Sequence, residues 1–192
     1  MKPDADTAPG PGITVRELRW SDFDRLRDIY WALYDERESQ RDIGITLYGT
    51  RPSFSDEVGW FTDHYRRVTA GSAISVVAEK DGVPIGHCAI RSLGANDDFE
   101  SAHVGELGIL VHRDHRGSGA GRALMRRALE QARGRFEIVR LSVFATNERA
   151  RRLYEEFGFV TVGTIPRVVR RGNEYFDEVL MFKEISRPGD RS

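Results

Sequence analysis

The segment at residues 109–125 (ILVHRDHRGSGAGRALM) constrains the fold more than any other part of the chain. An apolar run ends at Val111, and glycines follow at 117, 119 and 121, just before a pattern typical of an amphipathic helix. Closely spaced glycines let a backbone turn sharply and direct its N–H groups toward a ligand. The first turn of a helix adds N–H groups without intrahelical acceptors and a partial positive charge. The segment therefore predicts a strand, a loop and a helix, with the loop serving either as an anion site or as an ordinary glycine-rich turn.

Two common nucleotide-binding motifs do not match this segment. A Walker A loop places Lys and then Ser or Thr after its last glycine, whereas Arg122 and Ala123 follow here. The dinucleotide-binding spacing G-x-G-x-x-G is also absent, because the three glycines are evenly spaced at every second residue. The sequence therefore favours a phosphate-binding loop of another kind.

Hydrophobic periodicity predicts alternating strands and helices along the rest of the chain. Turn residues at Asp81-Gly82 and Gly172-Asn173 predict two hairpins. The predicted strands are 13–19, 73–80, 83–93, 103–111, 136–144, 159–165 and 174–185. The predicted helices begin after Ser21, begin after Ser53 or Ser55, and span 118–133 and 147–158, with a loop at 35–53.

This order of elements predicts a single α/β (α+β) domain. Hairpins join most neighbouring strands, whereas the helix at 118–133 makes one parallel crossover between two strands. A mixed sheet with helices packed on it accommodates both kinds of connection. The predicted domain is 13–185, with a disordered N-terminal arm at 1–12 and a polar tail at 186–192.

Composition excludes several classes of protein. The chain has 192 residues, and 29 basic against 30 acidic side chains give a net charge of −1, without the basic excess of a general nucleic-acid binder. No apolar stretch approaches the ~20 residues that span a bilayer, and residues 1–12 lack the apolar core of a secretory signal. The single cysteine, Cys88, has no intramolecular disulfide partner. We therefore expect a cytoplasmic protein with no membrane or nucleic-acid partner.

The near-zero net charge conceals a local basic cluster. Residues 112–135 contain seven arginines and two acidic side chains, so the remainder of the chain is acidic. Such a run of basic residues is typical of either a solvated helix face or an anion site. Its position is consistent with an anion site, because it includes the glycine loop and the helix that follows.

Two segments of the chain resemble the signature of the GNAT superfamily of N-acetyltransferases. The first is Arg116-x-x-Gly119-x-Gly121 after a strand that ends at Val111, and the second is LSVFATNERARRLYEEFGF at 141–159. The resemblance covers residues 13–185. It implies a central mixed, mostly antiparallel sheet of about seven strands flanked by about four helices, with a V-shaped splay between the strands at 103–111 and 137–144.

The resemblance also implies acetyl-CoA as co-substrate and no metal. The pyrophosphate of acetyl-CoA would lie on the loop and the start of the helix. The residues involved would be Arg116, Gly117, Ser118, Gly119, Ala120, Gly121 and Arg122. One of Arg122, Arg126 and Arg127 would meet the 3′-phosphate, unless these side chains form a solvated helix face.

The remaining contacts to acetyl-CoA would come from the two strands of the splay and from the helix after them. The pantetheine arm would pair with the backbone of Ile109, Leu110 and Val111, as an added strand pairs with a sheet edge. Asn147 would contact the same molecule, and its side chain is equally suited to cap the helix that follows.

The implied reaction is the attack of a neutral primary amine on a thioester, which needs a base and an acid. Tyr154 matches the family's general acid, although its place on an apolar helix face also suits a core tyrosine. Glu106 is the candidate base, because a carboxylate inside an apolar strand costs free energy unless it is solvated or partnered. His103 is a weaker candidate. We expect His87 and Cys88 to pack in the hairpin and take no covalent part.

The resemblance implies that two regions set the acceptor, namely the loop at 35–57 and the hairpin at 165–174, and that the acceptor is a small-molecule amine, an amino acid or a peptide N-terminus. The loop between the first two helices is acidic, which suits a polycation, whereas the last hairpin carries arginines that suit a carboxylate. These side chains are Asp35, Glu36 and Glu38 in the loop and Arg167, Arg170 and Arg171 in the hairpin. The ribosomal-protein alanine N-acetyltransferases carry Glu where this chain has Ser142.

The alternative function is a non-catalytic acyl-CoA-binding sensor or scaffold. A homodimer is common in the family.

Overall fold

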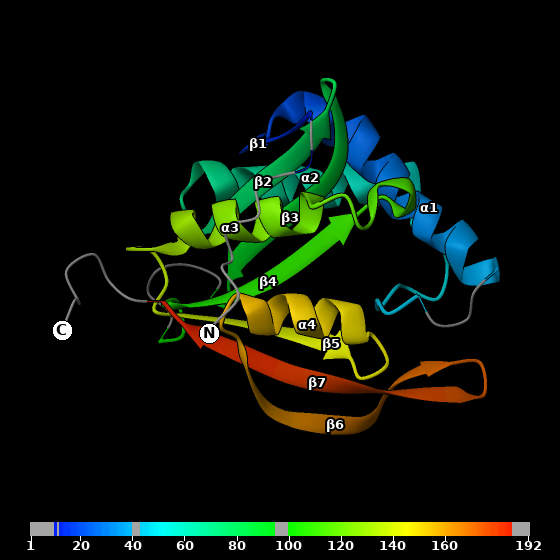
Figure 1. Ribbon diagram of the computed structural model, residues 1–192. Helices are drawn as coiled ribbons and strands as arrows, with labels where there is room; N and C mark the ends of the chain where they lie inside the picture. The colour runs from blue at the N-terminus through cyan, green and yellow to red at the C-terminus, as the bar shows by residue number, and fades with distance from the viewer. Residues whose placement is uncertain (1–9, 11, 40–42, 95–99, 186–192) are drawn as a thin grey trace.

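The computed structural model describes residues 10, 12–39, 43–94 and 100–185. These residues form one seven-stranded sheet in the order β1-β2-β3-β4-β5-β7-β6 (Figure 1). The strands are β1 (Ile13–Glu17), β2 (Ala73–Lys80), β3 (Val83–Ser92), β4 (Val104–Val111), β5 (Ile138–Phe144), β6 (Val160–Arg171) and β7 (Glu174–Glu184). Only β4 and β5 pair in parallel, so the predicted mixed, mostly antiparallel sheet is confirmed.

Four α-helices and two short 3-10 helices accompany the sheet within the described residues. They are η1 (Trp20–Asp22), α1 (Phe23–Ser39), α2 (Phe54–Thr69), η2 (Arg113–His115), α3 (Ala120–Ala132) and α4 (Glu148–Glu156). Neighbouring residues of β2 pack on different helices, because successive side chains of a strand point to opposite faces. Val76 belongs to the cluster that contains α3, whereas Val77 packs with Leu26 of α1 and Phe61 of α2. The helices therefore cover both faces of the sheet. None of the helices in the described ranges is long and apolar enough to cross a membrane.

The sheet opens between β4 and β5. Only Val104–Glu106 pair with Ile138–Arg140, although β4 continues to Val111 and stays paired with β3 over its whole length. Beyond Glu106 the two strands diverge, and α4 lies along the opening (Figure 1). The predicted V-shaped splay is therefore confirmed. It leaves backbone groups of β4 after Glu106 without a partner strand on the β5 side.

Two element boundaries differ by more than two residues from those predicted. α1 runs to Ser39, so residues 35–39, which were expected in a loop, are helical. The reason is a tertiary contact, since Glu36 is buried on α1 and pairs with Arg116. β6 runs to Arg171, six residues beyond the predicted end, because the strand continues past a register shift between Ile165 and Val169.

Candidate active site

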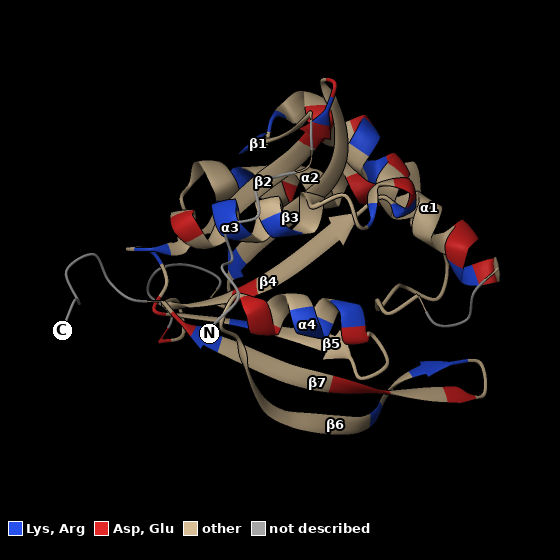
Figure 2. Ribbon diagram, viewed as in Figure 1, with Lys and Arg blue, Asp and Glu red and all other residues tan. Residues whose placement is uncertain are grey.

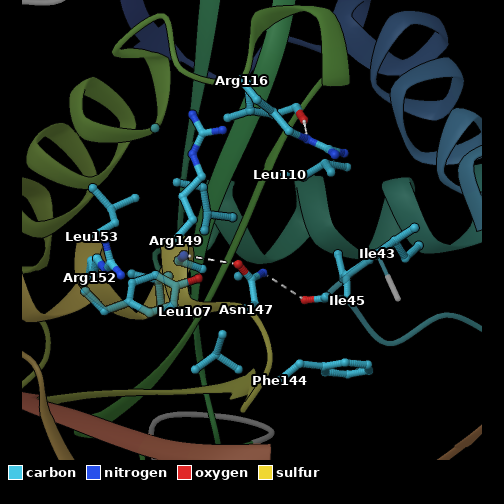
Figure 3. Close-up of a pocket in the computed structure, with 18 of the residues that line it drawn as sticks. Ile43, Ile45, Leu107, Leu110, Arg116, Phe144, Asn147, Arg149, Arg152 and Leu153 are labelled. Carbon is cyan, nitrogen blue, oxygen red and sulfur yellow. Dashed lines mark hydrogen bonds between the residues drawn. The ribbon is translucent and has the colours of Figure 1, made fainter. Parts of the chain in front are cut away.

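A large cavity of about 1280 Å³ occupies the opening between β4 and β5 (Figure 3). Its walls include Leu107 to Val111 of β4, Ser142 to Phe144 of β5 and much of α4, and its rim includes Arg116, Gly117, Gly119, Gly121 and Arg122. The volume exceeds the ~1,000 Å³ upper range of ordinary small-molecule sites, so the cavity has room for a long ligand together with a second molecule. We call it the splay cavity.

The glycine loop adopts a conformation that other residues rarely take. Gly117 and Gly119 have φ values of 88° and 90°, and α3 begins directly afterwards at Ala120. The Ser118 hydroxyl donates to the carbonyl of His115 at 2.6 Å, which holds the turn closed. The first N–H groups of α3 have no intrahelical acceptors and are placed at the rim of the cavity. The predicted glycine-rich turn before a helix is therefore present, and anion binding at this loop stays a prediction.

Arg116 is braced against α1 by an ion pair. Its guanidinium donates two hydrogen bonds to Glu36, at 2.5 and 2.8 Å, and its Nε donates to the carbonyl of Val111 at 3.2 Å. The Glu36 carboxylate is nearly buried, so the pair is shielded from solvent on the acidic side. The side chain of Arg116 therefore anchors the loop to α1 at the rim of the cavity.

The other arginines of the rim differ in their partners. Arg122 makes a forked pair with Glu156 of α4, at 2.6 to 3.0 Å. Arg149 of α4 has no hydrogen bond or ion pair within the described part of the chain, and one of its Nη atoms lies 3.0 Å from the position that a Cβ on Gly117 would take. Figure 3 shows the Arg149 side chain extending toward the glycine loop, and both α3 and α4 carry basic residues (Figure 2). Arg149 is thus the cation poised over the loop, and the sequence reasoning missed it.

Asn147 caps α4 and reaches across to the α1–α2 connection. Its Oδ1 accepts from the Ala150 N–H at 3.1 Å, and its Nδ2 donates to the Gly44 carbonyl at 3.2 Å (Figure 3). The helix-capping role is therefore present. The same residue lines the splay cavity, so a contact with a bound ligand stays a prediction.

Tyr154 projects from the buried face of α4 into the wall of the splay cavity. Its side chain is 7% exposed, and no hydrogen-bond partner of its hydroxyl is found among the described residues. Burial raises the pKa of the phenol above its ordinary value. The group therefore carries its proton at neutral pH, as a general acid must.

Glu106 stands where β4 and β5 part. It is the last residue of β4 that pairs with β5, opposite Arg140, and its carboxylate accepts from that guanidinium at 3.4 Å. The side chain is 44% exposed, so solvent and Arg140 together remove the cost of a carboxylate in an apolar strand. His103 precedes β4 at its closed end, is exposed and does not line the splay cavity. The geometry therefore favours Glu106 over His103.

Comparison with known proteins agrees with this arrangement. The family model described as "Acetyltransferase (GNAT) family" matches residues 23–159. The N-alpha-acetyltransferase RimI of Mycobacterium tuberculosis is 37% identical over 166 residues, which cover 86% of this chain and 88% of that protein.

This chain belongs to the GNAT family.

Two further similarities extend the comparison. The L-amino acid N-acyltransferase MnaT of Escherichia coli is 29% identical over 128 residues, which cover 66% of this chain and 70% of MnaT. The crystal structure of the phosphinothricin acetyltransferase Pat from Sinorhizobium meliloti in complex with AcCoA has a TM-score of 0.76 at 20% identity, and covers 91% of this chain and 89% of that one. That structure supports the fold, and the sequence matches identify the chain as an acetyltransferase of the GNAT family.

One wall of the splay cavity is formed by residues 43–46, which contact the last hairpin. Arg171 donates to the Ile45 carbonyl and lies over the rings of Phe144 and Phe176, at 5.2 and 5.5 Å. Thr46 donates to Glu178 at 3.1 Å. The acidic and basic groups expected to compete for the acceptor are therefore partly engaged, because Glu36 pairs with Arg116 and Arg171 holds the wall.

His87 and Cys88 lie in the hairpin, as expected. Cys88 is fully buried, and burial raises the pKa of its thiol. His87 Nε2 lies 2.6 Å from the hydroxyl of Ser75 on β2. Neither residue lines the splay cavity. Cys88 is therefore not placed to bond covalently to a ligand in the splay cavity.

Proposed function

We propose that the chain transfers the acetyl group of acetyl-CoA to the primary amine of an amino acid or a peptide N-terminus, by direct attack while both substrates are bound. The observation that carries this proposal is the opening of β4 from β5 just after Glu106, with Tyr154 in the wall of the same cavity. A candidate base and a candidate acid therefore border one space that is large enough for two substrates.

The residues at the rim fit the phosphates of acetyl-CoA. A Cβ on Gly117 would lie 3.0 Å from the Arg149 guanidinium, and the φ of 88° at this residue favours glycine. The N–H groups at the start of α3 favour negative charge, and Arg149 adds a cation without a competing carboxylate within the described residues. The unpaired edge of β4 from Leu107 to Val111 offers backbone donors and acceptors for an extended arm.

Each catalytic group has a defined proton to move. When bound, acetyl-CoA supplies a thioester carbonyl carbon, to which the amine nitrogen bonds as the C–S bond breaks. Glu106 accepts the proton that the amine nitrogen loses, and Tyr154 donates its phenolic proton to the departing sulfur. An unpaired N–H of β4 donates to the carbonyl oxygen as it gains charge. Proton transfer from Glu106 to Tyr154 through solvent then restores both groups.

The choice of acceptor follows from the similarities and from position 142. The two relatives act, by their names, on L-amino acids and on an N-alpha amine, and both acceptors carry a free α-amine. Ser142 lines the splay cavity and has no carboxylate to offer. The other glutamates that line the cavity have partners away from the point where the strands part, so we assign Glu106, which stands at that point, as the base.

The experiment is a thiol-release assay with acetyl-CoA over a panel of amines, amino acids and short peptides. We expect amine-dependent release in the wild type, and a fall in kcat of about 100-fold in Tyr154→Phe, because general acid catalysis contributes ~10²–10⁴-fold. Calorimetric titration should show that the affinity of this variant for CoA changes little. If CoA binds but no amine accelerates release, the chain is an acyl-CoA-binding sensor or scaffold instead. Equal losses of turnover and CoA affinity in Tyr154→Phe would contradict the acid role.

A further inference from the structure

A second, smaller cavity of about 350 Å³ lies between α2 and the ends of β3 and β4. We call it the α2 pocket and define it by Trp60, His64 and Arg67 of α2, Arg91 of β3 and Glu106 of β4. Arg91 and Glu106 line the splay cavity as well. The two cavities therefore meet at the proposed catalytic base.

His64 lines this pocket and has one ring nitrogen without a partner among the described residues. The residue is 2% exposed, and its Nε2 lies 3.1 Å from the Ser75 hydroxyl. Its Nδ1 is buried and has no hydrogen-bond partner among the described residues. The Trp60 ring stacks on the imidazole, with centroids 5.2 Å apart and an interplanar angle of 11°, which holds its orientation. A buried polar atom without a partner costs free energy, so a ligand group that binds Nδ1 recovers that cost.

The hydrogen-bond chain behind His64 permits either role for Nδ1. The Ser75 hydroxyl lies between the Nε2 atoms of His64 and His87, at 3.1 and 2.6 Å, and it has one proton to donate. If it donates to His87, then His64 donates from Nε2 and leaves Nδ1 bare. If it donates to His64, then Nδ1 carries the hydrogen and His87 donates in turn. A ligand that accepts a hydrogen bond selects the second arrangement.

One of the charges at the pocket favours a ligand that accepts. Two arginines, Arg67 and Arg91, and two carboxylates, Asp63 and Glu106, line it. Arg67 pairs with Asp63 at 2.8 Å and Glu106 with Arg140, whereas Arg91 has no hydrogen bond or ion pair within the described residues. Burial, followed by the positive charge of Arg91, lowers the pKa of the His64 imidazole to about 4. The ring is therefore neutral at pH 7 and donates from Nδ1 without carrying a charge of its own. An unpaired guanidinium beside a neutral N–H donor is an arrangement that suits a carboxylate.

The positions of Glu106 and Arg91 set the size of the ligand. These residues are direct partners in the antiparallel pairing of β3 and β4, so their Cα atoms lie about 4.5–5.5 Å apart. A molecule with its amine at Glu106 and its carboxylate at Arg91 must carry both groups within a few bonds of each other.

We propose that the α2 pocket binds the carboxylate of the acceptor through Arg91 and His64, and that the acceptor is therefore a free α-amino acid. This inference rests on the proposed function, in which Glu106 takes the proton of the acceptor amine. A peptide N-terminus has a neutral amide in place of that carboxylate and does not complete the pair of contacts.

The test compares L-amino acids with their primary amides in the full-length protein. Each pair differs only in the carboxylate, and the intrinsic reactivity of the two amines cancels when a variant is compared with the wild type. In Arg91→Gln we expect kcat/KM to fall about 10- to 100-fold for the acids and less than about threefold for the amides, because a charge-assisted hydrogen bond is lost only with the acids. Arg91 is exposed, so this variant should fold. His64→Phe keeps a ring for Trp60 to stack on. It should also lower the ratio of kcat/KM for the acids to kcat/KM for the amides.

Arg66→Gln is the matched control. Arg66 lies on α2 beside Arg67, pairs with the same Asp63 and does not line the pocket. Its removal should leave the ratio of acid to amide unchanged. Equal losses for acids and amides in Arg91→Gln and His64→Phe, or a wild type that prefers amides and peptides, would overturn the proposal.

Calorimetric titration of acids and amides into the CoA-bound protein separates this inference from the proposed function. If acids bind in a way that depends on Arg91 but are not turned over, the proposed function is wrong and the carboxylate-binding pocket is supported. If amines are turned over without a preference for acids, the proposed function is supported and the carboxylate-binding pocket is wrong.

Discussion

The splay cavity and the α2 pocket share Glu106 but are built from different kinds of groups. The walls of the splay cavity include two stretches that offer backbone groups, namely the unpaired edge of β4 and the glycine loop before α3. The α2 pocket is lined by side chains that come from α2, β3 and β4. Backbone groups are the same in every sequence, whereas side chains differ. The first cavity therefore suits a ligand common to a whole family, and the second suits the ligand that distinguishes one member.

The largest expected effect comes from Glu106, where the two cavities meet. Glu106→Gln keeps the size of the side chain but removes the base, so we expect kcat to fall on the order of 10²- to 10⁴-fold for every acceptor. CoA affinity should stay within about threefold of the wild type, since the phosphates bind at the other end of the cavity. Turnover close to that of the wild type would show that another group takes the proton.

A smaller effect is expected from the glycine loop. Gly119→Ala places a Cβ on a residue with a φ of 90°, which costs about 1–2 kcal/mol for an L-residue. We expect the loop to relax and the Kd for CoA to rise about tenfold, with the acid-to-amide ratio unchanged. A change in the acid-to-amide ratio would show that the glycine loop also affects binding in the α2 pocket.

Gly59→Ala is the control for this substitution. Gly59 lies in α2 with open space where a Cβ would be added. Alanine favours a helix by about 0.5–1 kcal/mol over glycine, so this variant should melt at a slightly higher temperature and bind CoA normally. Weakened CoA binding here would mean that glycine replacement acts through the fold in general.

The smallest effect is expected from Arg149. Arg149→Gln removes the cation over Gly117, and we expect the Kd for CoA to rise about 3- to 10-fold at low salt and by less at high salt. Arg66→Gln is the control, because Arg66 is exposed, pairs with Asp63 and does not line the splay cavity. Equal salt-dependent losses in the two variants would assign the effect to the net charge of the protein instead.

The glycine loop and the helix after it could be predicted from the sequence because each depends on residues close together in the chain, whereas the splay was implied by the resemblance to the GNAT superfamily. Glycines at 117 and 119 turn where only glycine turns easily, and α3 follows at once. The alternation of apolar and polar residues along the strands and the residues at the two hairpin turns are also local signals.

The partners of the site residues could not be predicted, because they come from distant parts of the chain. Arg116 and Glu36 are 80 residues apart, and their pairing extended α1 beyond its expected end. The α2 pocket brings together His64, Arg91 and Glu106 through the register of β3 with β4 and the packing of α2 on β2. Neither the spacing nor the composition of these residues carries that information.

The three residue pairs that join β4 to β5 have a mechanical consequence. They make the sheet two smaller sheets that share a short seam, one of β1 to β4 and the other of β5, β7 and β6. α3 and α4 are linked by Arg122 and Glu156, an exposed pair that contributes at most about 1 kcal/mol. A ligand that fills the splay cavity therefore acts as a cross-link between two halves of the molecule. Its concentration should set the melting temperature of the whole protein as directly as it sets the rate of the reaction.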